Sequence, residues 1–278
     1  MDILQYTFFQ NALVGTLLIS VVAAVIGTYI VMRRMLFIAG GLTHASFGGL
    51  GIGYYAGISP TISALIFAIA AAMGIDLLSH TKRIREDSAI ALFWAIGMAV
   101  GIIFVFLTPG YTPGLTEFLF GNILTITTTD ISLFAIYTLL LLAFVCLQYR
   151  PILYTAFDSD FAQIIGINTR RINTLMMLFI TVGVVLSIRL IGIMLLLSVL
   201  TLPQIIAELF TSQYKRMMIF SGIICFIGSM GGLFISAFIA APSGACIVVV
   251  LVILYAIAKA VSVIHTQLQR HKNLQIGQ

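Results

Sequence analysis

The chain has very little charge for its length. Of its 278 residues only 8% are charged and 61% are hydrophobic, and the mean hydropathy is +1.15. A soluble domain carries about 25% charged residues, so this sequence cannot cover a water-facing surface. We therefore predict an all-α bundle of membrane-spanning helices. It forms one domain over 1–278, because no linker or low-complexity stretch divides the chain.

The sequence also has few cysteines, and it lacks the common phosphate-binding loop of ATPases. The three cysteines, Cys146, Cys225 and Cys246, lie far apart within apolar runs. That spacing does not suggest a disulfide or a zinc motif and favours small packing residues. No GxxxxGK[ST] loop occurs, so the chain lacks this means of binding ATP. We expect no catalytic residue and no cofactor of its own; if ATP drives the protein, a separate subunit hydrolyses it.

The few basic residues are regularly placed. All but one of the 14 Lys and Arg residues lie in every second gap between apolar runs or near the C-terminus, and only Arg189 interrupts the pattern. The regular ones are Arg33, Arg34, Lys82, Arg83, Arg85, Arg150, Arg170, Arg171, Lys215, Arg216, Lys259, Arg270 and Lys272. Because basic loops are retained in the cytoplasm, we expect the N-terminus outside and the C-terminus inside. The net charge of +5 then reflects contact with lipid headgroups, not with nucleic acid.

The apolar runs are long enough for about nine spans of roughly 20 residues each. They are 10–31, 36–56, 60–79, 89–108, 131–149, 172–188, 190–208, 217–238 and 243–263. Arg189 makes 172–208 the weakest division, and one span there would give a total of eight. That alternative would place Lys215 and Arg216 outside. Two short spans with a tight outer turn keep them inside, so we favour nine.

Two connections are longer than tight turns. In the outer one, 109–130, the apolar stretch Phe118 to Ile126 is too short to cross and is expected to form a re-entrant or surface helix. The inner one, 150–171, contains a short amphipathic helix. Asp158 is its predicted N-cap, and Gly166 is expected to end it. Asp160 lies in its first turn, where a negative charge stabilises a helix.

The apolar face of this inner helix consists of Phe157, Phe161, Ile164 and Ile165. A helix lying in the lipid interface would have the same pattern, but its polar face would carry basic residues. Here the polar side carries Asp158, Asp160 and Gln163. A protein partner in the cytoplasm therefore gains weight over lipid.

Several segments resemble the integral-membrane permeases of bacterial ABC importers for zinc, manganese or iron. They are Gly41–Gly53 (GLTHASFGGLGIG), Phe120–Asp130 (FGNILTITTTD), Ala156–Asn168 (AFDSDFAQIIGIN), Gly192–Ala207 (GIMLLLSVLTLPQIIA) and Gly232–Ala245 (GLFISAFIAAPSGA). The last two are centred on Pro203 and on Pro242 and Gly244. Each match is weak alone, but their order and the span pattern are specific, and together they extend over most of the chain.

The resemblance implies a multi-pass permease of the bacterial cytoplasmic membrane that imports a divalent transition-metal ion. It also implies a second copy of the chain, two ATPase subunits that bind the ATP, and an extracytoplasmic metal-binding protein. By analogy, Phe157, Asp158 and Phe161 meet a groove on the ATPase. The inner helix, with Asp160, Ile164 and Gly166, then becomes a coupling helix.

His44 is the candidate metal ligand, since it lies near the middle of the span 36–56. Ionisable residues at that depth are rare and indicate a functional site as the first hypothesis. Neutral imidazole binds zinc and iron, and manganese less well. One histidine cannot complete a four-ligand site, so we expect two copies to present His44 to a shared path as a weak, transient site. Thr43 and Ser46 are lesser candidate ligands. The alternative is that His44 only fixes helix packing.

The residues around His44 are small. Many members of the family have an Asp one helical turn before the His, and Gly40 stands there in this sequence. Gly40 and Gly48 share the His44 face, and we expect them to leave space for an ion or water. The four-residue recurrence of Gly41, Ala45 and Gly49 favours close packing against a second helix.

Other polar residues carry less weight as ligands. They are Asp76, Asp130 and Glu208 near span ends, Ser198, Thr201 and Gln204 around Pro203, and His80, His265 and His271 in or near cytoplasmic segments. Span ends are solvated, and hydroxyls within helices usually bond to their own backbone.

Two other kinds of transporter remain as alternatives. A secondary carrier driven by protons or sodium would show repeats and a carboxylate within a span, and neither is evident. A permease for siderophores or cobalamin typically has ten spans, more than this chain has.

Overall fold

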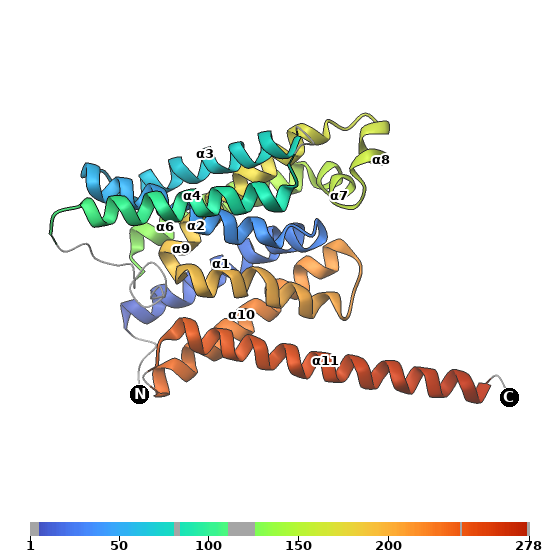
Figure 1. Cartoon of the computed structure of the whole chain (residues 1–278). Helices are drawn as coiled ribbons and strands as arrows, with labels where there is room; N and C mark the ends of the chain where they lie inside the picture. Colours follow the sequence, from blue (N-terminus) through green and yellow to red (C-terminus); the bar gives the residue numbers. More distant parts are fainter. Residues whose placement is uncertain (1–5, 81–83, 111–125, 240, 277–278) are drawn as a thin grey trace.

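The computed structural model describes residues 6–80, 84–110, 126–239 and 241–276, without the side chains of 80, 265, 266 and 268–276. This described part contains helices and no strands (Figure 1). The helices are α1 (Thr7–Met32), α2 (Leu36–Ala56), α3 (Pro60–His80), α4 (Glu86–Leu107), α6 (Thr128–Leu147), α7 (Tyr149–Phe157), α8 (Ser159–Ile164), α9 (Thr169–Glu208), α10 (Tyr214–Ile239) and α11 (Ser243–Ile276). The all-α membrane fold is confirmed.

Eight of these helices are long and apolar enough to cross a membrane. Seven of the nine expected spans each correspond to one of these helices. Their ends agree within a few residues, except at the C-terminal end of α11. That helix has 34 residues and continues past its apolar window, which ends at Ile264. Figure 1 shows it projecting beyond the rest of the bundle.

The remaining helix, α9, folds back on itself. It has 40 residues, which would make a straight helix of about 60 Å, twice the thickness of the hydrocarbon core. Gly192 interrupts it with φ 74° and ψ 170°, a conformation that is essentially restricted to glycine. Figure 1 shows α9 folding back within its length.

Contacts at the two ends of α9 agree with this reversal. Asn173 accepts a hydrogen bond from Tyr29 near the end of α1, and the ring of Tyr214, just after α9, lies 6.2 Å from that of Tyr149 in α7. Arg189, in between, pairs with Asp130 at the opposite end of the bundle. The chain therefore folds back within 172–208, as expected, but the break was expected at Arg189 and lies at Gly192.

The inner connection was expected to hold one short helix, and it holds two. α7 continues almost directly from α6, and Phe157 is its last residue, so Phe157 belongs to α7 and not to the amphipathic helix α8. The expected helix within 118–126 lies outside the described residues apart from Ile126.

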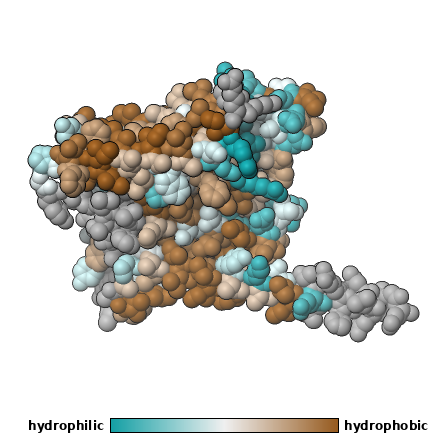
Figure 2. Space-filling view, viewed as in Figure 1, coloured by the Kyte–Doolittle hydropathy of each residue, from teal (hydrophilic) through white to brown (hydrophobic). Residues whose placement is uncertain are grey.

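The surface of the bundle fits a membrane environment. Figure 2 shows hydrophobic side chains across its body and hydrophilic ones gathered toward the end that holds α7 and α8. The last residues of α11 lie toward that same end, and the first residues of α1 lie toward the other (Figure 1). All three cysteines are free.

Candidate functional site

His44 lies half-buried on α2, and its imidazole stacks on the indole of Trp94 from α4. The ring centroids are 4.2 Å apart and the planes differ by 10°. Its Nδ1 atom is buried without a hydrogen-bond partner. The stack covers a face of the imidazole, whereas the lone pair of a ring nitrogen lies in the ring plane. Trp94 can therefore hold the ring in place and leave that nitrogen available to a ligand.

Small residues bring α2 and α4 close enough for this stack. A Cβ atom at Gly97 of α4 would collide with the backbone of Ala45, and one at Gly41 would collide with Ile90. A Cβ atom at Gly49 would likewise collide with the carbonyl oxygen of Ser63 in α3. The small residues of α2 thus set its distance from both neighbouring helices.

Gly40 and Gly48 differ from each other, although both were expected to leave open space. A Cβ at Gly48 would lie 2.9 Å from ring atoms of Phe67 and 3.0 Å from the carbonyl oxygen of Gly97, so that position is closely packed. A Cβ at Gly40 would lie 3.6 Å from Trp94 and 3.8 Å from Leu197, which are ordinary contacts. Only Gly40 therefore has room for a side chain beside His44.

This difference predicts opposite effects of two alanine substitutions. Gly40→Ala should leave stability unchanged or raise it by up to about 1 kcal/mol, because alanine favours helix over glycine. Gly49→Ala should cost about 1–3 kcal/mol, because the backbone of α3 must move away. Thermal unfolding of the two variants in detergent measures both effects, and equal melting temperatures would contradict the packing described here.

The hydroxyls beside His44 are already bonded within their own helix. Thr43 donates to the Ala39 carbonyl and Ser46 to the Thr43 carbonyl, each at 2.6 Å, and both residues are fully buried. Ser198 and Thr201 likewise donate to carbonyls of α9, at 3.4 Å and 2.8 Å. The metal-binding roles expected for Thr43 and Ser46 stay predictions, and no contact joins either hydroxyl to His44.

The first C-terminal signature, Gly192–Ala207, lies in α9 from the break at Gly192 onward. The second, Gly232–Ala245, runs from the end of α10 into the start of α11. Pro203 is buried in this part of α9, and its neighbour Gln204 donates to the Ala23 carbonyl of α1 at 2.6 Å. Pro242 directly precedes α11, and Gly244 is the second residue of that helix. Gln204 therefore joins α9 to α1, and Glu208 ends α9 as an exposed residue.

An ion pair joins α9 to α6 at the end of the bundle away from α7 and α8. Nε of Arg189 lies 2.8 Å from Oδ1 of Asp130, and Arg189 also donates to Thr61 of α3. Asp130 in turn completes a capping box with Thr127 at the start of α6. Arg189, the one basic residue outside the charge pattern, is thus paired with a carboxylate near the point where α9 folds back.

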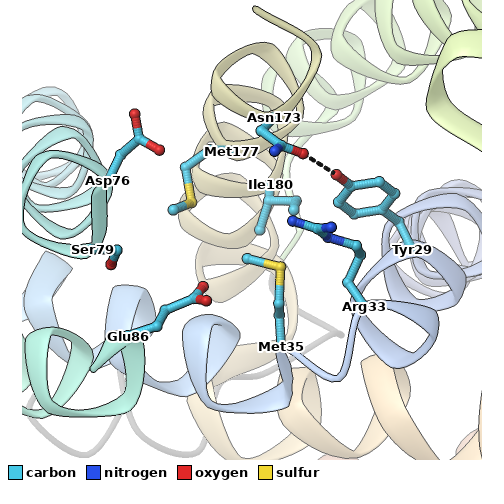
Figure 3. A pocket seen from close by; sticks show the side chains of 9 residues that line it. All are labelled: Tyr29, Arg33, Met35, Asp76, Ser79, Glu86, Asn173, Met177 and Ile180. Carbon is cyan, nitrogen blue, oxygen red and sulfur yellow. Dashed lines mark hydrogen bonds between the residues drawn. The ribbon is translucent and has the colours of Figure 1, made fainter. Parts of the chain in front are cut away.

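A cavity of about 220 Å³ opens at the opposite end of the bundle (Figure 3). It is lined by Tyr29, Arg33, Met35, Asp76, Ser79, Glu86, Asn173, Met177 and Ile180. Asp76 accepts a hydrogen bond from Thr174 at 3.4 Å. Of these residues only Asp76 was named above as a candidate ligand, because the other polar ones come from four helices that are separate in sequence.

The short helix α8 has the predicted cap and an open apolar face. Oδ1 of Asp158 accepts hydrogen bonds from the backbone N–H groups of Asp160 (3.0 Å) and Phe161 (2.9 Å). Gly166 follows with φ +86°. The exposed fractions of the expected apolar face are 57% for Phe157, 49% for Phe161, 82% for Ile164 and 48% for Ile165. This end of the bundle therefore exposes four large apolar side chains, and of these Phe161 also has an edge-on ring contact with Tyr154.

Comparison with known proteins agrees with this architecture. The model of the ABC 3 transport family matches residues 5–262. The chain is 31% identical over 256 residues to the "Manganese transport system membrane protein MntC" of Listeria monocytogenes, covering 92% of this chain and 91% of that protein. It is 26% identical over 259 residues to the "Probable iron transport system membrane protein" of Haemophilus influenzae, covering 93% of this chain and 95% of that one.

A solved structure agrees as well. The chain superposes on "PsaBC from Streptococcus pneumoniae in complex with Fab" with a TM-score of 0.81 and 27% sequence identity, covering 92% of each chain. The expected resemblance to permeases of metal-importing ABC transporters is thus confirmed, and so is a multi-pass location in the bacterial cytoplasmic membrane. This chain belongs to the ABC 3 transport family, as a membrane-spanning permease.

Proposed function

We propose that the chain imports a divalent transition-metal ion into the cytoplasm, powered by a separate ATPase. The observation that carries the cargo class is the buried, unpartnered Nδ1 of His44, held beside Trp94 within a membrane-spanning helix. A neutral imidazole nitrogen is a ligand for manganese, iron and zinc. Manganese is the first ion to test, since the Listeria monocytogenes relative is named for it.

A second copy of the chain would complete the site. No group of three His, Cys, Asp or Glu side chains among the described residues could hold a metal ion. With Gly40 in place of a carboxylate, each chain contributes His44 alone. Two copies facing one path would give a weak site, which suits a transported ion that must also leave.

The cytoplasmic end is the one that holds α7 and α8. Arg33 lies there, in contact with Thr155 of α7, and basic segments stay in the cytoplasm. The exposed apolar face beside Asp158 is suited to a groove on a protein partner. Because the sequence has no phosphate-binding loop of its own, the ATPase subunits would dock there, and a metal-binding protein would deliver the ion at the opposite end.

Reconstitution in proteoliposomes tests this function. The chain with its ATPase, with ATP on the ATPase side and the binding protein on the other, should accumulate manganese, iron or zinc, each supplied separately. The chain without the ATPase should accumulate none of them. Accumulation by the chain alone in a proton or sodium gradient would instead establish a secondary carrier.

A further inference from the structure

Arg33 ends α1 and reaches the junction between α7 and α8. Its Nη1 lies 3.1 Å from the carbonyl oxygen of Thr155 in α7 and 3.5 Å from Oγ of Ser159, the first residue of α8. Asp158, which caps α8, lies between these two acceptors in the sequence. One guanidinium group therefore contacts both sides of the junction.

The same end of α1 also contacts α9. Tyr29, one turn before Arg33, donates from its hydroxyl to Oδ1 of Asn173 at 3.1 Å. In Figure 3 the side chains of Tyr29 and Arg33 lie along one side of the cavity, with the carboxylates of Asp76 and Glu86 on the other. The end of α1 thus links the α7–α8 junction to the helices around the cavity.

From Arg33 the chain passes directly into the helix that carries His44. The turn consists of Arg33, Arg34 and Met35, and the Met35 N–H bonds back to the Ile30 carbonyl at 2.9 Å. Arg34 has φ 57°, and among the described residues it is the one non-glycine residue with positive φ. Because this turn is short and hydrogen-bonded, a displacement of Arg33 would also displace Leu36, the first residue of α2.

We propose that Arg33 is a positioning residue that transmits movement of α8 to α1 and α2, so that ATP hydrolysis in the partner moves the ion past His44. This inference rests on the proposed function. If the ATPase moves α8, Arg33 would move with it, because its guanidinium group contacts both Ser159 and Thr155. Arginine suits this task because its planar guanidinium has several donors in a fixed arrangement, whereas lysine has one compact charge.

The test is the number of metal ions transported per ATP hydrolysed, measured with the reconstituted chain and its ATPase. In Arg33→Gln this ratio should fall about tenfold, the effect of losing a charge-assisted hydrogen bond, while ATP hydrolysis stays within about twofold. Arg33→Lys keeps the charge without the two-acceptor geometry, so its ratio should lie between those of the wild type and Arg33→Gln. Arg216→Gln, which removes an exposed charge at the same end of the bundle, should keep the wild-type ratio.

Each other outcome has a definite meaning. If the ratio is unchanged in Arg33→Gln, or if hydrolysis and transport fall together, Arg33 has at most a structural role and the inference is wrong. Full recovery in Arg33→Lys would show that charge alone suffices and would contradict the two-acceptor geometry. A wild-type complex without ATP-driven uptake would refute the proposed function and this inference with it.

Discussion

Replacement of His44 by alanine should lower ATP-driven metal uptake at least about 100-fold, since even residues that only support a metal ligand contribute 10–100-fold. The expected cause is the loss of the imidazole nitrogen that each copy of the chain offers to the ion. Uptake by reconstituted vesicles measures this effect. The amount of folded protein, determined by size-exclusion chromatography, shows whether the variant is still intact.

His44→Phe separates metal binding from packing. Phenylalanine keeps a flat ring that can stack on Trp94, an interaction of about 0.5–1.5 kcal/mol, but it has no nitrogen. If His44 binds the ion, the phenylalanine variant should be folded and inactive. Near-normal uptake by this variant would show that the ring serves packing alone.

A charge on the open face of α8 should abolish coupling to the ATPase. Phe161 is 49% exposed in this chain, so Phe161→Asp should leave the fold intact. In a docked complex the same carboxylate would be buried without a partner. The affinity for the ATPase should then fall at least about 30-fold, as when a residue worth about 2 kcal/mol is lost from an interface. Co-purification of the ATPase and metal uptake both measure the loss.

Gln163→Glu is the matched control for this substitution. It places one negative charge on the same short helix but outside the apolar face, so ATPase binding should stay close to that of the wild type. Equal losses in the two variants would mean that net charge decides the binding. An unchanged affinity in Phe161→Asp would mean that the ATPase docks elsewhere.

The membrane-spanning helices could be predicted from the sequence because hydropathy and length depend on local composition. The position of the reversal in α9 could not. Arg189 suggested a turn because it is charged, but its charge is paired with Asp130, far away in sequence. The backbone instead reverses at Gly192, and the apolar residues around it gave no sign of this.

The candidate site was predicted only in part, for a similar reason. The depth of His44 in an apolar run marked it as functional, and its neighbours at helical spacing followed. Trp94 was missed because its stacking on His44 depends on how α2 and α4 pack. Its being the chain's single tryptophan was the one available signal. Gly40 and Gly48 looked equivalent on a helix, and only the positions of Phe67 and Leu197 separate them.

Tryptophan fluorescence of the purified chain tests most directly whether the ion is held at His44. Trp94 is the single tryptophan, and it stacks on the proposed ligand. Paramagnetic Mn²⁺ bound to His44 should quench this fluorescence saturably in the wild type, and His44→Phe should abolish the quenching. Equal quenching in the wild type and in His44→Phe would place the ion elsewhere and contradict this account.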